Sequence, residues 1–184
     1  MIIAYHTVFS TYGTWLPNDP RGSYSKAVYD DEIRALGTPR YGRQDPRPAK
    51  ETLRRFWAAS RGVTNRPAFF IDDSTRRIVA RGFSRTVERL GLTIGACAIM
   101  NNHVHLLSMR SKHRIEYVAG RFKAEATRAL GLAETPWAKG CWKVFIEDTG
   151  AIASAARYIE MNPIKAGWGP QRWDFVTPLS GVGG

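Results

Sequence analysis

The sequence predicts an α+β protein of the split βαβ, ferredoxin-like type, with an antiparallel sheet, helices on one face and an extra C-terminal helix. Three observations lead to this fold class. Apolar patterns follow the order strand, helix, strand, strand, helix, strand, helix along the chain. The pair Asn101-Asn102 separates the two central strands and suits a hairpin turn. The 184 residues are enough for a single domain, expected to span residues 1–184, with a sizeable core.

The first strand is expected at residues 2–10, which are rich in β-branched and aromatic side chains. Residues 13–70 then form an insertion before the first helix of the fold. This insertion contains six of the ten prolines, and eleven Lys or Arg against six Asp or Glu. A short helix is expected within it at residues 50–59. Because long loops in compact domains are usually functional or mobile, the insertion either covers a nucleic acid or is a surface segment without a ligand.

The central elements follow the insertion. Apolar side chains recur at helical spacing over residues 74–90, after a group of N-cap residues, and predict the first helix of the fold. Residues 92–100 are almost wholly apolar and predict a buried central strand, with residues 103–110 as the return strand.

The turn between these strands determines which residues face each other. Asn101 and Asn102 suit a two-residue loop because asparagine tolerates positive φ. Ala98 then opposes His105, and Ala96 lies one step further along the same face. These small side chains are expected to leave space above the histidine face for a metal ion and a substrate phosphate.

The last third of the chain supplies the remaining elements. An apolar stripe predicts a helix over residues 115–129, and Gly131 is its C-terminal signal. A short strand is expected at residues 142–147. The final helix is expected over residues 149–161 and is predicted to stop near Pro163.

The composition indicates a globular protein with a polyanionic partner. Hydrophobic residues make up 43% of the chain and charged residues 23%. The net charge of +11 favours nucleic acid as the partner, with a solubility feature or a membrane-surface patch as the alternatives. The basic residues are dispersed, so they are expected on the folded surface.

The expected location is the cytoplasm, in association with the nucleoid. The sequence contains no run of about 18 apolar residues, so no membrane span is expected. The N-terminal residues do not have the pattern of a signal peptide. The two cysteines, Cys97 and Cys141, show no pairing pattern, which favours a reduced protein.

His103 and His105 carry the strongest chemical signal in the sequence. On a strand, residues i and i+2 point to the same face, so the two imidazoles would lie side by side. This arrangement suits two ligands of a metal ion, although a histidine hydrogen-bonded in the core would give the same pattern. With Asn162 as an oxygen donor, the set would suit Mg²⁺ or Mn²⁺ acting as a Lewis acid on a phosphate.

Tyr158 precedes Asn162 by four residues, so the phenol and the carboxamide share one helix face. A tyrosine nucleophile needs a nearby positive centre, since its unperturbed pKa is about 10. A metal on the facing strand would meet that need. The alternatives are ordinary helix packing for Tyr158 and an ordinary helix C-terminal residue before proline for Asn162.

Two blocks, residues 102–107 (Asn-His-Val-His-Leu-Leu) and 157–167 (Arg-Tyr-Ile-Glu-Met-Asn-Pro-Ile-Lys-Ala-Gly), resemble the single-tyrosine HUH transposases. The chain is most similar to the REP-associated tyrosine branch, relatives of the IS200-like transposases that move single-stranded DNA. Residues 5–17 are also similar to that branch, whereas the resemblance is weakest over residues 18–70. The sequence departs from the family at Asn101, where a proline is frequent.

The resemblance implies an RRM-like core in which His103, His105 and Asn162 bind Mg²⁺ or Mn²⁺ and Tyr158 is the nucleophile. It implies cleavage of single-stranded DNA beside a REP-like hairpin, which leaves a 5′-phosphotyrosine and a free 3′-hydroxyl that can later rejoin strands. A homodimer is one option for its assembly. DNA contacts are expected from basic and aromatic side chains, namely Trp15, Arg21, Arg121, Lys123 and Lys165.

Two other functions stay open at this point. The first is a basic RRM-like module that holds hairpins without cutting them. The second is a zinc-dependent phosphohydrolase that uses His-x-His and water. A covalent DNA adduct would separate the transposase from both, and nuclease activity that survives the loss of Tyr158 would favour the hydrolase.

Overall fold

The computed structural model describes residues 1–177, with the exception of 24, 26, 27, 29, 30 and 43. The chain divides into two compact units. One consists of Met1–Ser10 together with the chain from Phe70 onward, and the other is Thr11–Phe69. The limits of the second unit lie close to those of the expected insertion, and a single domain spanning the whole chain stays a prediction.

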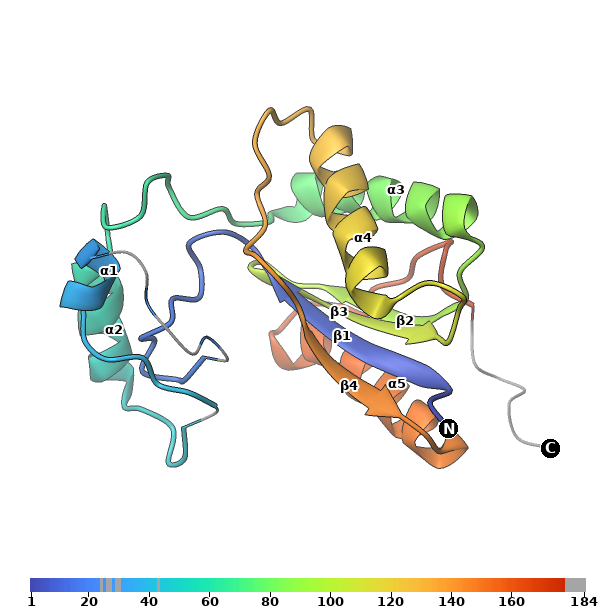
Figure 1. Ribbon diagram of the computed structural model, residues 1–184, viewed down its shortest axis with the longest axis horizontal. Coiled ribbons are helices and arrows are strands. Elements are labelled where there is room, and N and C mark those ends of the chain that lie inside the picture. Colours follow the sequence, from blue (N-terminus) through green and yellow to red (C-terminus); the bar gives the residue numbers. More distant parts are fainter. Residues whose placement is uncertain (24, 26–27, 29–30, 43, 178–184) are drawn as a thin grey trace. The chain divides into compact units, whose positions relative to one another are not determined.

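The first unit contains the whole sheet and three helices, in the predicted order (Figure 1). Among its described residues the second unit has two short helices, and only the one at residues 50–59 was predicted. The elements of both units are β1 Ala4–Ser10, α1 Asp31–Ala35, α2 Lys50–Ala59, α3 Asp73–Leu90, β2 Ile94–Ile99, β3 His103–Met109, α4 Ile115–Ala129, β4 Trp142–Ile146 and α5 Thr149–Lys165.

The four strands form one antiparallel sheet in the order β2-β3-β1-β4. Helices α3 and α4 cover one face of the sheet, and α5 covers the other (Figure 1). This architecture confirms the predicted fold class and places the additional C-terminal helix opposite the first two. The predicted hairpin register is also confirmed, because Ala98 pairs with His105 and Met100 N donates to His103 O at 2.8 Å.

The face under α3 and α4 is packed with large side chains. The ring of Phe83 lies 5.0 Å from that of Phe122 and 6.1 Å from that of Phe9, centroid to centroid. The two helices cross where α3 has Gly82, because a Cβ at that position would come within 2.7 Å of the Ala126 Cα. The absence of a side chain therefore lets the helix backbones meet.

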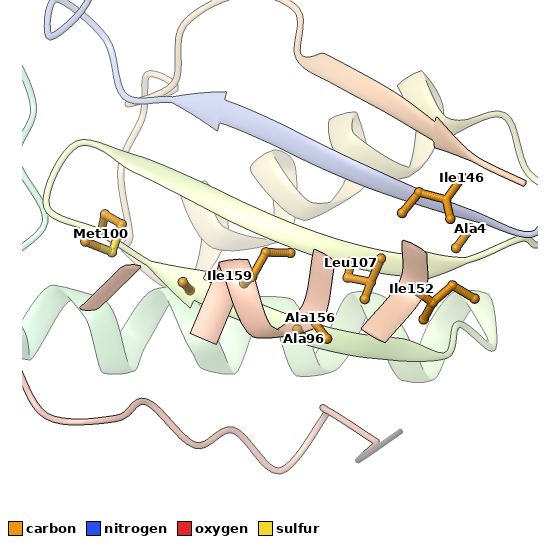
Figure 2. Close-up of a cluster of buried hydrophobic side chains, with 9 residues drawn as sticks. Ala4, Ala96, Met100, Leu107, Ile146, Ile152, Ala156 and Ile159 are labelled. Carbon is orange, nitrogen blue, oxygen red and sulfur yellow. The ribbon is translucent and has the colours of Figure 1, made fainter. Parts of the chain in front are cut away.

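The face under α5 is packed with small and aliphatic side chains. Ile152, Ala156 and Ile159 of α5 lie against Ala96 and other buried residues of the sheet (Figure 2). Ala96 and Ala98 are 1% and 0% exposed within this cluster. The prediction that these alanines leave space for a metal and a phosphate is wrong, because α5 fills the space above them.

Two further details differ from the sequence expectations. The turn at Asn101-Asn102 does not use positive φ, since every described residue with positive φ is a glycine. Helix α5 does not stop near Pro163 but continues to Lys165. Pro163 removes the N–H that would bond to the carbonyl of Ile159, and the Asn162 side chain donates to that carbonyl instead, at 3.5 Å.

The unit Thr11–Phe69 is mostly irregular and is held by side-chain contacts with the backbone. Trp15 Nε1 donates to Gly22 O at 2.8 Å. The guanidinium of Arg21 forms a two-point ion pair with the buried carboxylate of Asp19 and lies 4.1 Å from the centre of the Trp15 ring and 5.2 Å from that of Trp57. Among the described residues of both units, no helix has the length and apolar character that crossing a membrane requires.

Candidate active site

Strand β3 places two imidazoles on the α5 face of the sheet. The Nε2 atoms of His103 and His105 point at each other and lie 3.0 Å apart. His105 is buried, with 6% of its surface exposed, while His103 is half-buried. The Nδ1 atom of His103 is 2.7 Å from Asn102 Oδ1, so the residue that makes the turn also holds the first histidine.

A third histidine, which sequence reasoning missed, belongs to the same cluster. His6 of β1 faces the same side of the sheet, and its Nε2 is 3.0 Å from Nδ1 of His105. It is 8% exposed. The only sequence signal was a histidine in an apolar strand, and its partner could not be identified without the pairing of β1 with β3.

Burial disfavours the charged forms of two of these histidines, His105 and His6. Removal from water, together with the smaller effect of charge repulsion from His103 and His6, lowers the pKa of His105 to about 3. Burial also lowers the pKa of His6. The neutral imidazole is the form that binds metal ions, so the environment of His105 favours a ligand over a cation.

Helix α5 brings Tyr158 to the histidines. Its ring centroid lies 5.8 Å from that of His105 and 5.8 Å from that of His6, edge-on in both cases. Tyr158 is 51% exposed, so its ring borders the histidine cluster and remains accessible from solvent. Lys165 Nζ lies 5.9 Å from the centre of the same ring, which places a positive charge beside the phenol.

Asn162 lies one turn after Tyr158 on α5. Its Nδ2 donates to the carbonyls of Tyr158, at 2.8 Å, and Ile159, so the amide nitrogen is directed to the helix backbone. These two bonds use the amide nitrogen, so the carbonyl oxygen Oδ1 is the atom that can bind another partner. The local hydrogen bonding of α5 thus selects the oxygen of Asn162 as the candidate ligand.

The separation of the two Nε2 atoms is that of two ligands of one metal ion. Two nitrogen ligands at roughly 2.1 Å from a metal and at right angles to each other are about 3.0 Å apart, which is the separation of the two Nε2 atoms. Within the described part of the chain, no group of three His, Cys, Asp or Glu side chains could hold a metal. A further protein ligand would therefore be of another type, such as the Asn162 amide that the sequence predicts.

The expected DNA contacts belong to both units of the chain. Lys165 is beside Tyr158, whereas Arg121 and Lys123 are on α4, across the sheet from the histidines. Arg121 is paired with Glu125 at 3.0 Å, and Lys123 Nζ donates to the carbonyls of Ala138 and Gly140. Trp15 and Arg21 contact each other within the unit Thr11–Phe69. Of the three expected contacts within the first unit, Lys165 is the one that lies beside Tyr158.

The fold resembles that of a known class of DNA enzyme. The solved structure of a REP-associated tyrosine transposase bound to a REP hairpin matches with a TM-score of 0.52 and 12% identity, over 91% of this chain and 70% of that chain. This match shows that the chain has the fold of these transposases, in agreement with the resemblance of its HUH and tyrosine motifs.

A protein from Deinococcus radiodurans R1, described as a candidate transposase, matches with a TM-score of 0.38 and 13% identity over 87% of this chain and 90% of that chain. This similarity is too low to support an argument. No family model matches the sequence, and no curated protein matches it either.

Proposed function

We propose that the protein is a metal-dependent endonuclease and strand transferase that acts on single-stranded DNA beside a hairpin. One observation carries this proposal: the phenol of Tyr158 borders the same imidazole, His105, whose Nε2 faces Nε2 of His103. A nucleophile and a candidate phosphate-binding metal site are thus adjacent. Both come from one chain, and the proposal is an active site assembled in cis.

The reaction that these groups support is an attack of Tyr158 on a phosphodiester. The phenol oxygen forms a bond to phosphorus while the bond from phosphorus to the 3′-oxygen breaks. The phenol loses its proton and the departing oxygen gains one, so the products are a 5′-phosphotyrosine and a 3′-hydroxyl. Attack by a 3′-hydroxyl on the phosphotyrosine reverses these bond changes and rejoins strands.

His103, His105 and Asn162 are the residues that would hold Mg²⁺ or Mn²⁺. Such an ion would supply positive charge to the phosphate oxygens and to the ionising phenol. Lys165 adds a positive charge on the same side of the ring. The exposed position of Tyr158 allows a DNA strand to reach it without opening the core.

The proposed partner is single-stranded DNA with a hairpin, in the compartment that holds the DNA. The net charge of +11 favours a polyanion, and the transposase of similar fold was solved with a REP hairpin. Binding is expected to weaken steeply as salt rises, because it releases counterions from the phosphates. A homodimer stays a prediction.

The test uses a pool of hairpin DNAs with randomised single-stranded flanks, incubated with the protein and Mg²⁺ or Mn²⁺. We expect a denaturation-resistant adduct with the 5′-phosphate on the peptide that contains Tyr158, detected by mass spectrometry. Tyr158→Phe should bind DNA but form no adduct. Tyr117→Phe is a matched control, since Tyr117 has the same exposed fraction of 51% but lies on α4.

Three outcomes would contradict the proposal. Hairpin binding without any adduct would indicate a non-cutting binding module. Cleavage that survives Tyr158→Phe and requires zinc would indicate a hydrolase. An adduct on a different residue would move the nucleophile elsewhere.

A further inference from the structure

Four side chains form a row of close contacts across the sheet. His6 Nε2 lies 3.0 Å from His105 Nδ1, His105 Nε2 lies 3.0 Å from His103 Nε2, and His103 Nδ1 lies 2.7 Å from Asn102 Oδ1. The ring centroids of His6 and His105 are 5.2 Å apart. Because His6 and His105 are both buried, the hydrogen bond between them is screened little by water.

The row has one fully hydrogen-bonded arrangement when its rings are neutral. A neutral imidazole has one N–H and one lone pair. Asn102 Oδ1 can only accept, so His103 donates from Nδ1 and presents a lone pair at Nε2. His105 must then donate from Nε2 to His103, and His6 must donate from Nε2 to His105. In this arrangement Nε2 of His105 carries a proton and cannot act as a ligand.

A second arrangement frees both Nε2 atoms. The proton of His105 lies on Nδ1 and is donated to Nε2 of His6, whose own proton lies on its Nδ1. Two lone pairs then face each other at 3.0 Å, which is unfavourable unless a cation lies against them. The total number of protons is the same in both arrangements, since His6 and His105 each move their proton between their own nitrogens by exchange with water.

We infer that His6 is a positioning residue that accepts the Nδ1–H bond of His105, and that binding of a divalent metal reverses the hydrogen bond between them. The inference rests on the metal site of the proposed function. Histidine ligands commonly donate their second ring nitrogen to an acceptor that fixes the tautomer. Here that acceptor for His105 is another buried imidazole, and for His103 it is Asn102 Oδ1.

The first test reads the tautomers directly by ¹⁵N NMR of the imidazole nitrogens in the full chain, at neutral pH and without DNA. The chain has four histidines, so the eight ring signals can be assigned. We expect the proton of His105 on Nε2 in the absence of metal and on Nδ1 at saturating Mg²⁺. The ring signals of His113, which packs on Tyr117, should not change. A His105 tautomer that is the same with and without bound Mg²⁺ would overturn the inference.

The second test measures Mn²⁺ affinity by titration calorimetry. His6→Phe keeps an aromatic ring but removes the acceptor, so we expect Mn²⁺ to bind about 10- to 100-fold more weakly. His6→Gln retains an acceptor oxygen and should recover part of the affinity. His113→Phe is the matched control and should bind Mn²⁺ like the wild type.

A folded His6→Phe protein with wild-type Mn²⁺ affinity would overturn the inference. If His6→Phe does not fold, the Mn²⁺ affinity of His6→Gln and the NMR experiment on the wild type test the inference instead, since neither depends on the His6→Phe variant. The tests also separate this inference from the proposed function. Metal binding with the expected tautomer change but without DNA cleavage would support the role of His6 and contradict the endonuclease. Wild-type protein that binds neither Mg²⁺ nor Mn²⁺ would overturn the role of His6.

Discussion

The two faces of the sheet are filled by different kinds of side chain. Under α3 and α4, Phe83 contacts Phe122, Phe9 and Trp137 through ring pairs with centroids 5.0, 6.1 and 6.5 Å apart. Under α5 the helix contributes small and aliphatic residues that lie against Ala96 and Leu107 (Figure 2). His6, His103 and His105 lie on this second face, next to the exposed Tyr158.

This difference separates the source of stability from the residues of the proposed chemistry. Large buried rings remove much apolar area from water, and burial of one such side chain contributes roughly 1.5–3 kcal/mol. Small residues contribute less but allow a helix backbone to approach a sheet closely. We conclude that the α3/α4 face stabilises the fold, while the α5 face holds Tyr158 at a set distance from the histidines.

The largest effect on stability is expected from Phe83→Ala. Phe83 is 0% exposed and its ring joins α3 to α4 and to β1. Its loss leaves a cavity and should lower the free energy of unfolding by about 3–5 kcal/mol, measured by urea denaturation. The control is Phe70→Ala, at a position that is 58% exposed, which should change stability by less than about 0.5 kcal/mol. Equal losses of stability for the two variants would contradict the conclusion that the buried rings of the α3/α4 face stabilise the fold.

Gly82→Ala tests the helix crossing on the same face. The added Cβ would lie 2.7–2.8 Å from backbone atoms of Ala126 and Glu125, so the two helices must separate. We expect a loss of about 1–3 kcal/mol in the free energy of unfolding. Gly120→Ala on α4 is the matched control, because a Cβ there meets nothing within 4 Å. Since alanine has the higher helix propensity, by about 1 kcal/mol, this control should be slightly more stable than the wild type.

Local patterns explain why most of the fold could be predicted. The apolar spacing of α3 and α4, the N-cap at Asp72 and the hairpin at Asn101-Asn102 involve residues close in sequence. The pairing of Ala98 with His105 follows from the length of that turn alone. The side-by-side arrangement of His103 and His105 could be predicted for the same reason, because it needs only the geometry of one strand.

The parts that could not be predicted depend on contacts between distant residues. His6 meets His105 across 99 positions, and no local pattern indicates that β1 lies beside β3. Gln171 closes the outer edge of β2 by bonding to both the N–H and the carbonyl of Ile99, which also depends on the tertiary fold. The continuation of α5 past Pro163 is a different case: there the Asn162 side chain donates to the Ile159 carbonyl, which has lost its usual N–H partner.

The stability that the α3/α4 face contributes is expected to depend on pH through Glu125. Its carboxylate is buried between Arg128, Arg89 and Arg121, and the hydrogen bond from Arg128, followed by the charges of the three arginines, lowers its pKa. A lowered pKa in the folded state means that the stabilisation is present above the unfolded value, about 4.3, and is lost as pH falls through the folded value.

We therefore expect Glu125→Gln to lower the free energy of unfolding at pH 7 by about 1 kcal/mol. The variant should also lose less stability than the wild type when urea denaturation is repeated at pH values below about 4.3. Identical acid sensitivity of the two proteins would show that Glu125 does not contribute. Glu88→Gln, at an exposed position of α3, is the control for a change of one charge.

The smallest effect on stability is expected at Tyr158, the nucleophile of the proposed reaction. Tyr158→Phe removes one hydroxyl from a side chain that is 51% exposed, and the ring can keep its edge-on contacts with His105 and His6. The free energy of unfolding should change by less than about 0.5 kcal/mol, as for Tyr117→Phe, while formation of the DNA adduct disappears. A loss of several kcal/mol would mean that the phenol stabilises the α5 face, and the separation of stability from chemistry between the two faces would then be wrong.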